Sequence, residues 1–287
     1  MGKRILLTGA TGFIGRTVLP LLRKRFAVDA PGRAELNLLD DEAVAAFVRS
    51  GAYDAVIHTA NPTPAKNPLD RADRLFAESL RAYFNLRRQA DCFGRLLYVG
   101  SGAEYDKRRD LLAVTEESVG QSLPADDYGF AKFLMNEDAR RSLNVTNLRL
   151  FGCYGPTDAK TKFIRDAIDC CLEGRAITIR QDCLFDYLYV EDLGGILSQM
   201  VLAPRLRHDY NICTGEAVAL SSIAAIVARQ MGNARPIEIA RPGMNRAYTA
   251  SNARFRHDFP DISFTPLEEG IARQIAWQKE HHEEKSR

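Results

Sequence analysis

The stretch TGATGFIG, which begins at Thr8, constrains the fold of this chain more than any other feature. An apolar run leads into it, and apolar residues at helical spacing follow as far as Leu22. A strand, a glycine-rich turn and a helix in this order are the context in which a dinucleotide binds. Gly9 permits the tight turn, Gly12 lets a pyrophosphate approach the backbone, and Gly15 lets the helix pack close to the strand.

The backbone amides at the start of this helix are expected to face the phosphates of the dinucleotide, because the first turn of a helix has unpaired N–H groups. A glycine triplet alone is a weak signal, but this one lies between a strand and a helix and has partners further along the chain. The cofactor-binding residues predicted in this turn are Gly9, Thr11, Gly12, Phe13, Ile14 and Gly15.

The residue that faces the adenosine ribose decides between NAD and NADP, because an acid there accepts from the 2′-hydroxyl and an arginine binds a 2′-phosphate. Asp29 lies about 20 residues after Gly9, the spacing that favours NAD. The connection before the second predicted strand, at 26–30, is short, so we expect Asp29 inside that strand rather than at its tip. Arg33 then occupies the loop beyond the strand, with Arg16 nearby on the first helix, and we favour NADP over NAD.

Composition and charge exclude several classes of protein. The chain is 46% hydrophobic and 26% charged, as in soluble globular proteins, and a net charge of +2 gives no reason to expect nucleic acid or a membrane as partner. No apolar run approaches the roughly 20 residues of a membrane helix, and residues 1–4 run into the first strand without a signal peptide. The six cysteines form no CxxC pair, so we expect reduced thiols in a cytoplasmic protein. The histidines at 281–282 are assigned to a frayed tail, and no metal site is expected.

Strands and helices alternate along the chain, which indicates an α/β fold with a doubly wound parallel sheet. Strands are predicted at 4–7, 26–30, 55–58, 95–100 and 176–179, and helices at 13–22, 41–49, 72–90, 128–143, 163–172, 190–202, 221–231 and 266–281. The third strand ends in three small residues, Thr59, Ala60 and Asn61, where a cofactor ribose can lie against the backbone. His58, just before them, is expected to be a core residue.

The predicted chemistry lies where the fourth strand ends. Ser101 follows that strand directly, and ligands of such sheets bind at the carboxyl ends of the strands. Tyr128 and Lys132 are four residues apart at the start of a predicted helix, so they share one face. A nearby ammonium favours the phenolate and is expected to lower the pKa of the tyrosine from about 10. Tyr128 would then exchange a proton with a substrate oxygen held by Ser101 while a hydride moves at the adjacent carbon.

Several motifs together resemble the NAD-dependent epimerase/dehydratase family of extended short-chain dehydrogenases/reductases. They are TGATGFIG, VIHTAN at 56–61, LLYVGSGAEY at 96–105, YGFAK at 128–132, RLFGCYGP at 149–156, FDYLYVEDL at 185–193, YNICTG at 210–215 and RPG at 241–243. The resemblance covers nearly the whole chain. It implies a Rossmann core at 1–155, to which later segments such as 185–213 return. It also implies a small C-terminal α/β lobe at 156–287 that covers a nucleotide-sugar.

The same resemblance assigns roles to residues outside the glycine turn. It implies Ser101, Tyr128 and Lys132 as the catalytic set, with Tyr128 and Lys132 also touching the cofactor. The other implied cofactor contacts are Asn37 and Leu38 near the adenine, Thr59, Ala60 and Asn61 beside the ribose, and Phe151. A homodimer built from the helices at 72–90 and 128–143 is a further expectation by resemblance.

The segment RAELNLLD at 33–40 resembles the GDP-L-fucose synthases, which are NADPH-dependent epimerase-reductases. Two groups that ring epimerisation needs in those enzymes are replaced here by Ala103 and Lys162, and the acid pair of nucleotide-sugar 4,6-dehydratases is replaced by Gly102 and Ala103. We therefore predict an NADPH-dependent reductase of a keto group on a nucleotide-sugar. An NAD-dependent 4-epimerase is the alternative, and a non-catalytic cofactor-binding sensor is the third hypothesis.

The positions that the resemblance implies for the substrate are Ala103, Lys162, Phe185 and Arg241. Gly152 stands where the family usually has an asparagine that contacts the substrate, and Phe185 stands where many relatives carry an arginine for the diphosphate. Arg241 is able to pair with a phosphate. A different nucleotide-sugar, or a substrate without a diphosphate, is also compatible with the sequence.

Overall fold

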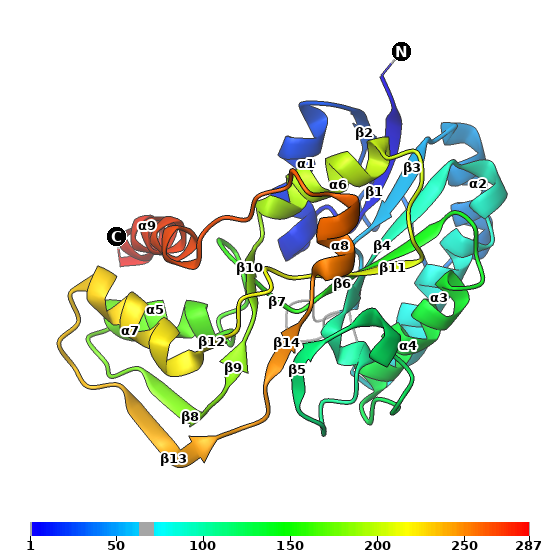
Figure 1. Cartoon of the computed structure of the whole chain (residues 1–287). Helices are drawn as coiled ribbons and strands as arrows, with labels where there is room; N and C mark the ends of the chain where they lie inside the picture. The colour runs from blue at the N-terminus through cyan, green and yellow to red at the C-terminus, as the bar shows by residue number, and fades with distance from the viewer. Residues whose placement is uncertain (1, 63–71, 287) are drawn as a thin grey trace.

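Six strands form a parallel sheet at the centre of the larger part of the computed structural model, which describes residues 2–62 and 72–286 (Figure 1). The strands are β1 (Arg4–Thr8), β2 (Ala27–Asp29), β3 (Ala55–His58), β4 (Arg95–Ser101), β6 (Val145–Leu150) and β11 (Asp209–Ile212). They lie in the order β11-β6-β4-β3-β1-β2, and every neighbouring pair is parallel. The predicted doubly wound sheet is confirmed.

Helices cover both faces of this sheet, because successive side chains of its strands point to opposite faces. Ile5 and Leu7 of β1 belong to an apolar cluster with α1 (Phe13–Arg23) and α6 (Asp192–Leu202). Leu6, between them, belongs to a second cluster with α2 (Asp41–Gly51), α3 (Leu75–Arg87) and α4 (Asp127–Ala139). Strands β1, β3 and β4 read as nearly continuous apolar runs and are predicted from the sequence. Strands β6 and β11 carry buried polar residues such as Asn147 and Asn211 and are not predicted.

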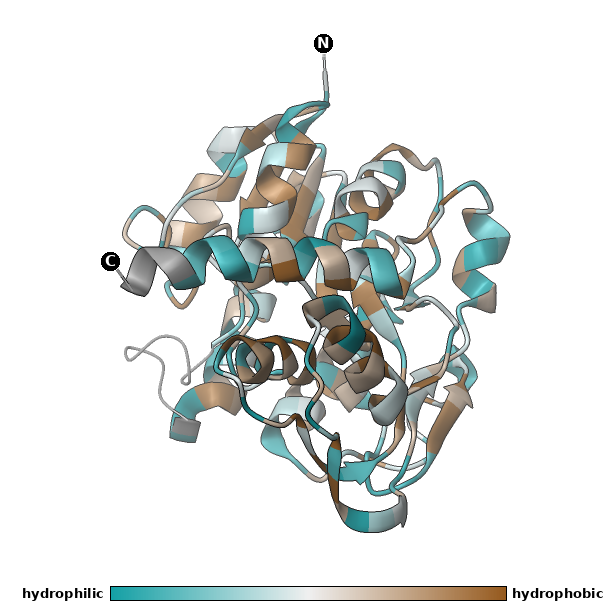
Figure 2. Cartoon of the chain, turned by 90° about the vertical axis from the view of Figure 1, so that its left-hand side faces the viewer, coloured by the Kyte–Doolittle hydropathy of each residue, from teal (hydrophilic) through white to brown (hydrophobic). Residues whose placement is uncertain are grey.

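The smaller lobe has its own apolar cluster between three helices and short strands. The helices are α5 (Phe163–Leu172), α7 (Leu220–Met231) and α9 (Leu267–Ser286), and a ribbon of β8 (Thr178–Asp182) and β13 (Glu238–Met244) lies at the edge of the lobe (Figure 1). In Figure 2, α9 crosses the front of the molecule, and hydrophilic and hydrophobic residues alternate along it. Its buried residues Ile271 and Ile275 belong to the cluster of the lobe.

Short strands connect the two parts. A mixed sheet has the order β12-β9-β14-β5, and β7 pairs with β10. The strands are β5 (Leu111–Val114), β7 (Gly152–Tyr154), β9 (Leu184–Phe185), β10 (Tyr187–Tyr189), β12 (Val218–Ala219) and β14 (Tyr248–Ala250), with helix α8 (Ala253–Asp258) after the last. Helix α6 and strand β11 lie in the segment 185–213, which was predicted to return to the core, and they join the large sheet and its helix layer. The exact domain boundaries stay a prediction.

Four short 3₁₀ turns complete the described elements: η1 (Ala72–Arg74), η2 (Ala90–Cys92), η3 (Gly102–Glu104) and η4 (Glu116–Ser118). Two of them flank α3, so the helix predicted at 72–90 is shorter than expected, and α4 ends at Ala139 rather than at 143. The predicted frayed tail is wrong, because α9 continues to Ser286. The ring of His281 stacks on Trp277 with centroids 4.0 Å apart, and its Nδ1 lies 2.8 Å from the Trp277 carbonyl oxygen.

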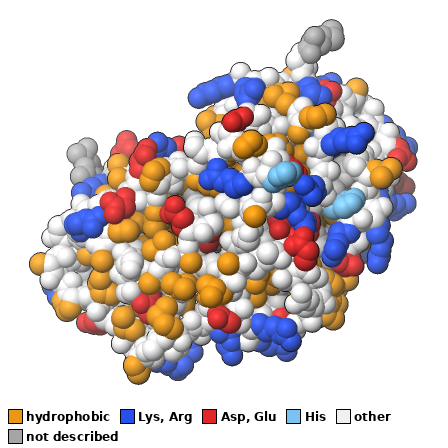
Figure 3. All heavy atoms as spheres, viewed as in Figure 1, with side chains coloured by type: hydrophobic (Ala, Val, Ile, Leu, Met, Phe, Trp, Pro, Cys, Tyr) orange, Lys and Arg blue, Asp and Glu red, His pale blue; other side chains and the backbone are white. Residues whose placement is uncertain are grey.

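The surface of the protein carries charges of both signs (Figure 3). On the face shown in Figure 3, acidic and basic side chains are interspersed. Of the helices in the described ranges, none combines the length and the apolar character of a membrane span. Within the same ranges, no cluster of three or more His, Cys, Asp or Glu side chains is arranged to hold a metal ion. All six cysteines are free thiols.

Candidate active site

A cavity of ≈ 580 Å³ opens at the carboxyl ends of β1 and β3. This is the edge of a parallel sheet at which nucleotides bind. The predicted cofactor residues that line the cavity are Gly9, Thr11, Gly12, Phe13, Ile14, Arg33, Asn37, Leu38, Thr59, Ala60 and Asn61. The structure thus gathers three segments that are distant in the sequence around one space.

The glycines of the turn are explained by close approach. Gly9 has φ +78°, and a Cβ there would lie 2.5 Å from the backbone nitrogen of Ala60. A Cβ on Gly15 would lie 2.1 Å from the Gly9 carbonyl oxygen, so Gly15 packs against the turn and does not line the cavity. Gly12 is the N-cap of α1 and supplies no side chain to the first amides of the helix. A phosphate can therefore approach the start of this helix, and the cavity fits a dinucleotide.

The acid expected to favour NAD is engaged elsewhere. Asp29 is the last residue of β2, not an interior one as predicted, because the strand ends before Pro31. Its carboxylate accepts from the Arg4 guanidinium and from the Tyr53 hydroxyl, each at 2.8 Å, and it does not line the cavity. Arg33 and Arg16 both do.

The loop at 36–39, beside the predicted adenine position, is held by hydrogen bonds from two directions. The side chain of Asn37 accepts from the backbone N–H of Leu39 at 3.2 Å, and Asn85 of α3 donates to the carbonyl of Leu38 at 2.9 Å. Leu36 is buried beneath the loop. The cavity wall is therefore fixed by contacts that do not depend on a ligand.

The structure brings Ser101, Tyr128 and Lys132 together. Ser101 ends β4, and Tyr128 is the second residue of α4, whose N-cap Asp126 accepts from the Gly129 amide at 2.9 Å. Ser101 is close enough to Tyr128 to lower the pKa of its phenol, and the Lys132 ammonium lies 5.9 Å from the centre of the tyrosine ring. Lys132 also donates to the carbonyl of Val99 in β4 at 2.9 Å, which ties the helix to the strand.

The electrostatics of the set differ from the prediction. Burial raises the pKa of Tyr128 above its usual 10, Ser101 opposes this, and the charges of Glu104 and Asp126 add to it. The expected acidic phenol is therefore wrong for the protein alone. Burial lowers the pKa of Lys132 to about 8, although Glu104 opposes the shift. At neutral pH the tyrosine is a neutral phenol and the lysine is mostly an ammonium.

His58 is a core residue, as predicted. It is 3% exposed, and its Nδ1 lies 2.7 Å from the hydroxyl of Thr8 on the neighbouring strand. Burial lowers the pKa of its imidazole to about 3, and the charge of Lys132 acts in the same direction. His58 is thus neutral at physiological pH and is not available as an imidazolium acid.

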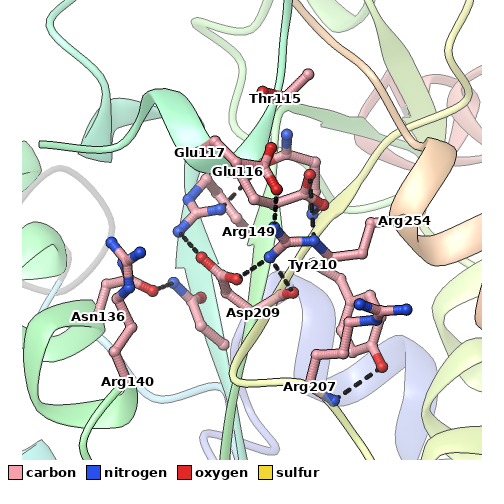
Figure 4. Close-up of polar contacts among 12 residues, drawn as sticks. Thr115, Glu116, Glu117, Asn136, Arg140, Arg149, Arg207, Asp209, Tyr210 and Arg254 are labelled. Atoms are coloured by element: carbon pink, nitrogen blue, oxygen red, sulfur yellow. Dashed lines mark hydrogen bonds and ion pairs between the residues drawn. The ribbon is translucent and has the colours of Figure 1, made fainter. Parts of the chain in front are cut away.

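The sequence motifs did not indicate the buried ion cluster that lies under Ser101. Arg149 has no exposed surface and pairs with Glu104 at 2.7 Å. It also pairs with Asp209 at 3.0 Å, and Arg254 pairs with Asp209 from the other side (Figure 4). Glu104 also accepts from the Ser101 backbone N–H at 3.1 Å. The cluster therefore fixes the turn that carries Ser101.

Three residues of the cavity wall come from segments that the sequence did not indicate. Glu78 and Ala82 come from α3, and Thr157 comes from the loop after β7. Thr157 has φ +67°, which is unusual for a β-branched residue. Its buried hydroxyl has no hydrogen-bond partner in the described part of the chain. Strain of this kind is found at ligand-binding positions, but no sequence pattern announces it.

The residues predicted to bind substrate are dispersed. Ala103 is buried beside Ser101, and Phe185 packs its ring 5.0 Å from that of Tyr248. Lys162 is exposed at the N-cap of α5, and Arg241 lies on β13, where every residue is exposed. Their role in binding stays a prediction.

Tyr128 and Lys132, also predicted to touch the cofactor, are not among the residues that line the cavity, and neither is Phe151. The Phe151 ring packs between Tyr105 and Tyr248, at centroid distances of 5.9 and 5.0 Å. The side chain is 9% exposed. It belongs to a small apolar cluster that supports the strand ends.

Comparison with known proteins places this site in context. The sequence profile of the NAD dependent epimerase/dehydratase family matches residues 5–213. The ADP-L-glycero-D-manno-heptose-6-epimerase of Pseudomonas paraeruginosa is 24% identical over 330 aligned positions, which cover 95% of this chain and 98% of that protein.

Two solved structures show the same fold at 18% sequence identity. A GDP-L-fucose synthetase from Naegleria fowleri bound to NADP has a TM-score of 0.83, with 98% of this chain and 95% of that chain covered. A GDP-mannoheptose C4 reductase from Campylobacter jejuni with NADP bound has a TM-score of 0.82, with 97% and 98% covered. The likeness extends over both the large sheet and the smaller lobe.

Proposed function

This chain belongs to the NAD dependent epimerase/dehydratase family, and we propose that it is an NADPH-dependent reductase of a keto group on a nucleotide-sugar. The observation that carries the proposal is a neutral phenol, Tyr128, beside Ser101, with no acid or base side chain at the two positions that follow the serine. A neutral phenol is the form that donates a proton, as reduction of a ketone requires. The names of the relatives support a nucleotide-sugar as substrate.

The residues of the site have distinct tasks in this reaction. NADPH, when bound, supplies the hydride. Ser101 donates a hydrogen bond to the carbonyl oxygen and orients it, and Tyr128 gives that oxygen its proton as the alkoxide forms. The Lys132 ammonium, anchored on Val99, stabilises the phenolate that remains. Each proton that moves starts from a group that holds it at neutral pH.

Steps that need a further acid or base lack their groups here. Gly102 and Ala103 bear no titratable side chain. The nearest carboxylate along the chain, Glu104, is fully buried against Arg149 and also accepts from the Asn147 amide at 2.9 Å. Elimination of water or deprotonation of a ring carbon therefore has no obvious base beside Ser101.

The preference for NADP rests on the adenosine end of the cavity. Asp29 is held by Arg4 and Tyr53, whereas Arg33 and Arg16 line the cavity. Arg16 also donates to the carbonyl of Thr11 at 2.6 Å, which fixes its position beside the turn. A guanidinium in that place attracts a 2′-phosphate.

The experiment is a spectrophotometric assay of the purified protein with NADPH and a panel of 4-keto nucleotide-sugars that differ in nucleotide. A reductase consumes one NADPH for each sugar reduced, and NADH is the poorer donor. Absence of NADPH consumption with every member of the panel, in a protein that binds NADPH, would contradict the proposal.

The alternative is an epimerase that holds NAD tightly, either a 4-epimerase or an enzyme like the heptose 6-epimerases named above. The overall similarity to these epimerases, over 95% of the chain, favours it. Such an enzyme purifies with NAD bound and interconverts sugar epimers without net consumption of cofactor. A non-catalytic sensor, the third hypothesis, binds cofactor but turns over nothing in either assay.

We also propose a homodimer built on α3 and α4, which pack against each other on one face of the sheet. Phe84 of α3 leaves 37% of its surface exposed, which a partner subunit would cover. Light scattering after size-exclusion chromatography is expected to give twice the 32.0 kDa of one chain. A mass of one chain would overturn this. A cytoplasmic location stays a prediction from the sequence.

A further inference from the structure

A second tyrosine reaches the reaction centre from the far end of the chain. Tyr248 is the first residue of β14, where it pairs with Leu111 of β5 and with Phe185 of β9. Its ring lies between those of Phe151 and Phe185, with centroids 5.0 Å away on each side. Backbone pairing and ring packing together fix the direction of the phenol.

The hydroxyl of Tyr248 lies next to Ser101, in space that a side chain at position 102 would fill. A Cβ on Gly102 would lie 2.6 Å from the Tyr248 hydroxyl oxygen and 2.9 Å from the Phe151 ring. The Tyr248 phenol is also close enough to two neighbours for them to shift its pKa: the Ser101 side chain lowers it, and Tyr128 raises it. Two phenols therefore meet one serine.

The hydrogen-bonding capacity of Ser101 decides what the second phenol does. A serine hydroxyl has one proton to donate and two lone pairs that accept. One lone pair takes the backbone N–H of Ala103 at 3.1 Å. Burial raises the pKa of Tyr248, so its phenol keeps its proton and is a donor at physiological pH. If Tyr248 fills the second lone pair, the proton of Ser101 is left for another acceptor.

We propose that Tyr248 is a positioning residue, whose hydroxyl donates to Ser101 and so directs the serine proton at the substrate oxygen. This inference rests on the proposed function, since it assigns Ser101 to the oxygen that Tyr128 protonates. It also explains the aromatic residue at position 185, because the Phe185 ring packs against Tyr248.

The contact is tested without turnover by NMR of the full-length protein with ¹³C-labelled tyrosine rings. The Tyr128 and Tyr248 signals are assigned from Tyr128→Phe and Tyr248→Phe. In Ser101→Ala, the Tyr248 signal is expected to shift together with that of Tyr128. The Tyr210 signal is expected to stay, because its hydroxyl bonds Asp258. An unmoved Tyr248 signal overturns the proposal, whatever the enzyme reduces.

The role is tested by kinetics with the keto-sugar that the reductase assay identifies. Tyr248→Phe is expected to lower kcat roughly tenfold, the effect of one hydrogen bond, with KM nearly unchanged. In a Ser101→Ala background the same change is expected to have no further effect, because Tyr248 acts through the serine. An unchanged kcat in the single variant, or equal losses in both backgrounds, refutes the assignment.

Tyr105→Phe is the matched control, since it removes a buried hydroxyl from the same aromatic cluster. That hydroxyl bonds Asn211 and the Thr115 carbonyl, each at 3.0 Å, and does not reach Ser101. The control is expected to lose stability but to keep kcat. If wild type reduces no keto-sugar, the proposed function fails, and the NMR result still decides whether Tyr248 and Ser101 are coupled.

Discussion

Replacing Arg149 with methionine is expected to lower the free energy of unfolding by about 3–5 kcal/mol, the cost of breaking a buried ion pair from one side. The guanidinium donates at 2.7 Å to Glu104, at 3.0 Å to Asp209 and at 3.1 Å to the side chain of Asn211, all in the interior. Methionine fills similar volume but satisfies none of these acceptors. Asp209 keeps its pair with Arg254, so the penalty falls mainly on Glu104.

The assay is urea unfolding at several pH values. Burial already raises the pKa of Glu104 while Arg149 opposes the shift, so loss of the arginine raises that pKa further. A carboxyl group whose pKa is higher in the folded than in the unfolded protein destabilises the fold fully above its folded-state pKa, and not at all below its unfolded-state pKa. The loss of stability in Arg149→Met is therefore expected to shrink as the pH falls. The double variant Arg149→Met/Glu104→Gln is expected to recover part of the loss. A penalty below about 1 kcal/mol, or one independent of pH, would refute this account of the cluster.

Three further predictions concern cofactor binding and proton transfer. Arg33→Ala is expected to weaken NADP binding roughly 10-fold or more, as loss of a charged hydrogen bond does, and to leave NAD affinity nearly unchanged in calorimetry; equal losses for both would remove the NADP preference. The rate of reduction is expected to fall as the pH rises through about 8, where Lys132 loses its proton. In Lys132→Arg this fall is expected at a higher pH, and identical pH–rate profiles of the two proteins would show that Lys132 does not cause it. Thr157→Gly is expected to raise the free energy of unfolding in urea by about 1 kcal/mol, because it relieves backbone strain, and to weaken NADPH binding in a fluorescence titration. A lower free energy of unfolding would show that Thr157 is not strained.

Local sequence patterns predicted helices and strands better than they predicted contacts between distant residues. The strand at 55–58 was located to the residue, because an apolar run between turn signals marks a strand buried on both faces. The spacing of Tyr128 and Lys132 sufficed to place both on one turn of α4. Such features depend on neighbours within a few residues, which a sequence displays directly.

Features that depend on distant residues were missed or misjudged. Nothing near Tyr248 indicates that its phenol meets Ser101, 147 positions earlier, through the gap left by Gly102. The pKa of Tyr128 was expected to fall, because the sequence shows an ammonium one turn away but not the burial that outweighs it. The charge of Glu104 acts in the same direction as burial, and its partner Arg149 comes from another strand.

The central claim is that Tyr128 gives its proton to the oxygen of a carbonyl reduced in the cofactor cleft. The most direct measurement is the single-turnover rate of NADPH oxidation by Tyr128→Phe with a keto nucleotide-sugar that wild type reduces. The account predicts a rate about 10²–10⁴ times lower than that of wild type, the usual contribution of a general acid, with NADPH affinity kept. A rate close to that of wild type would contradict it.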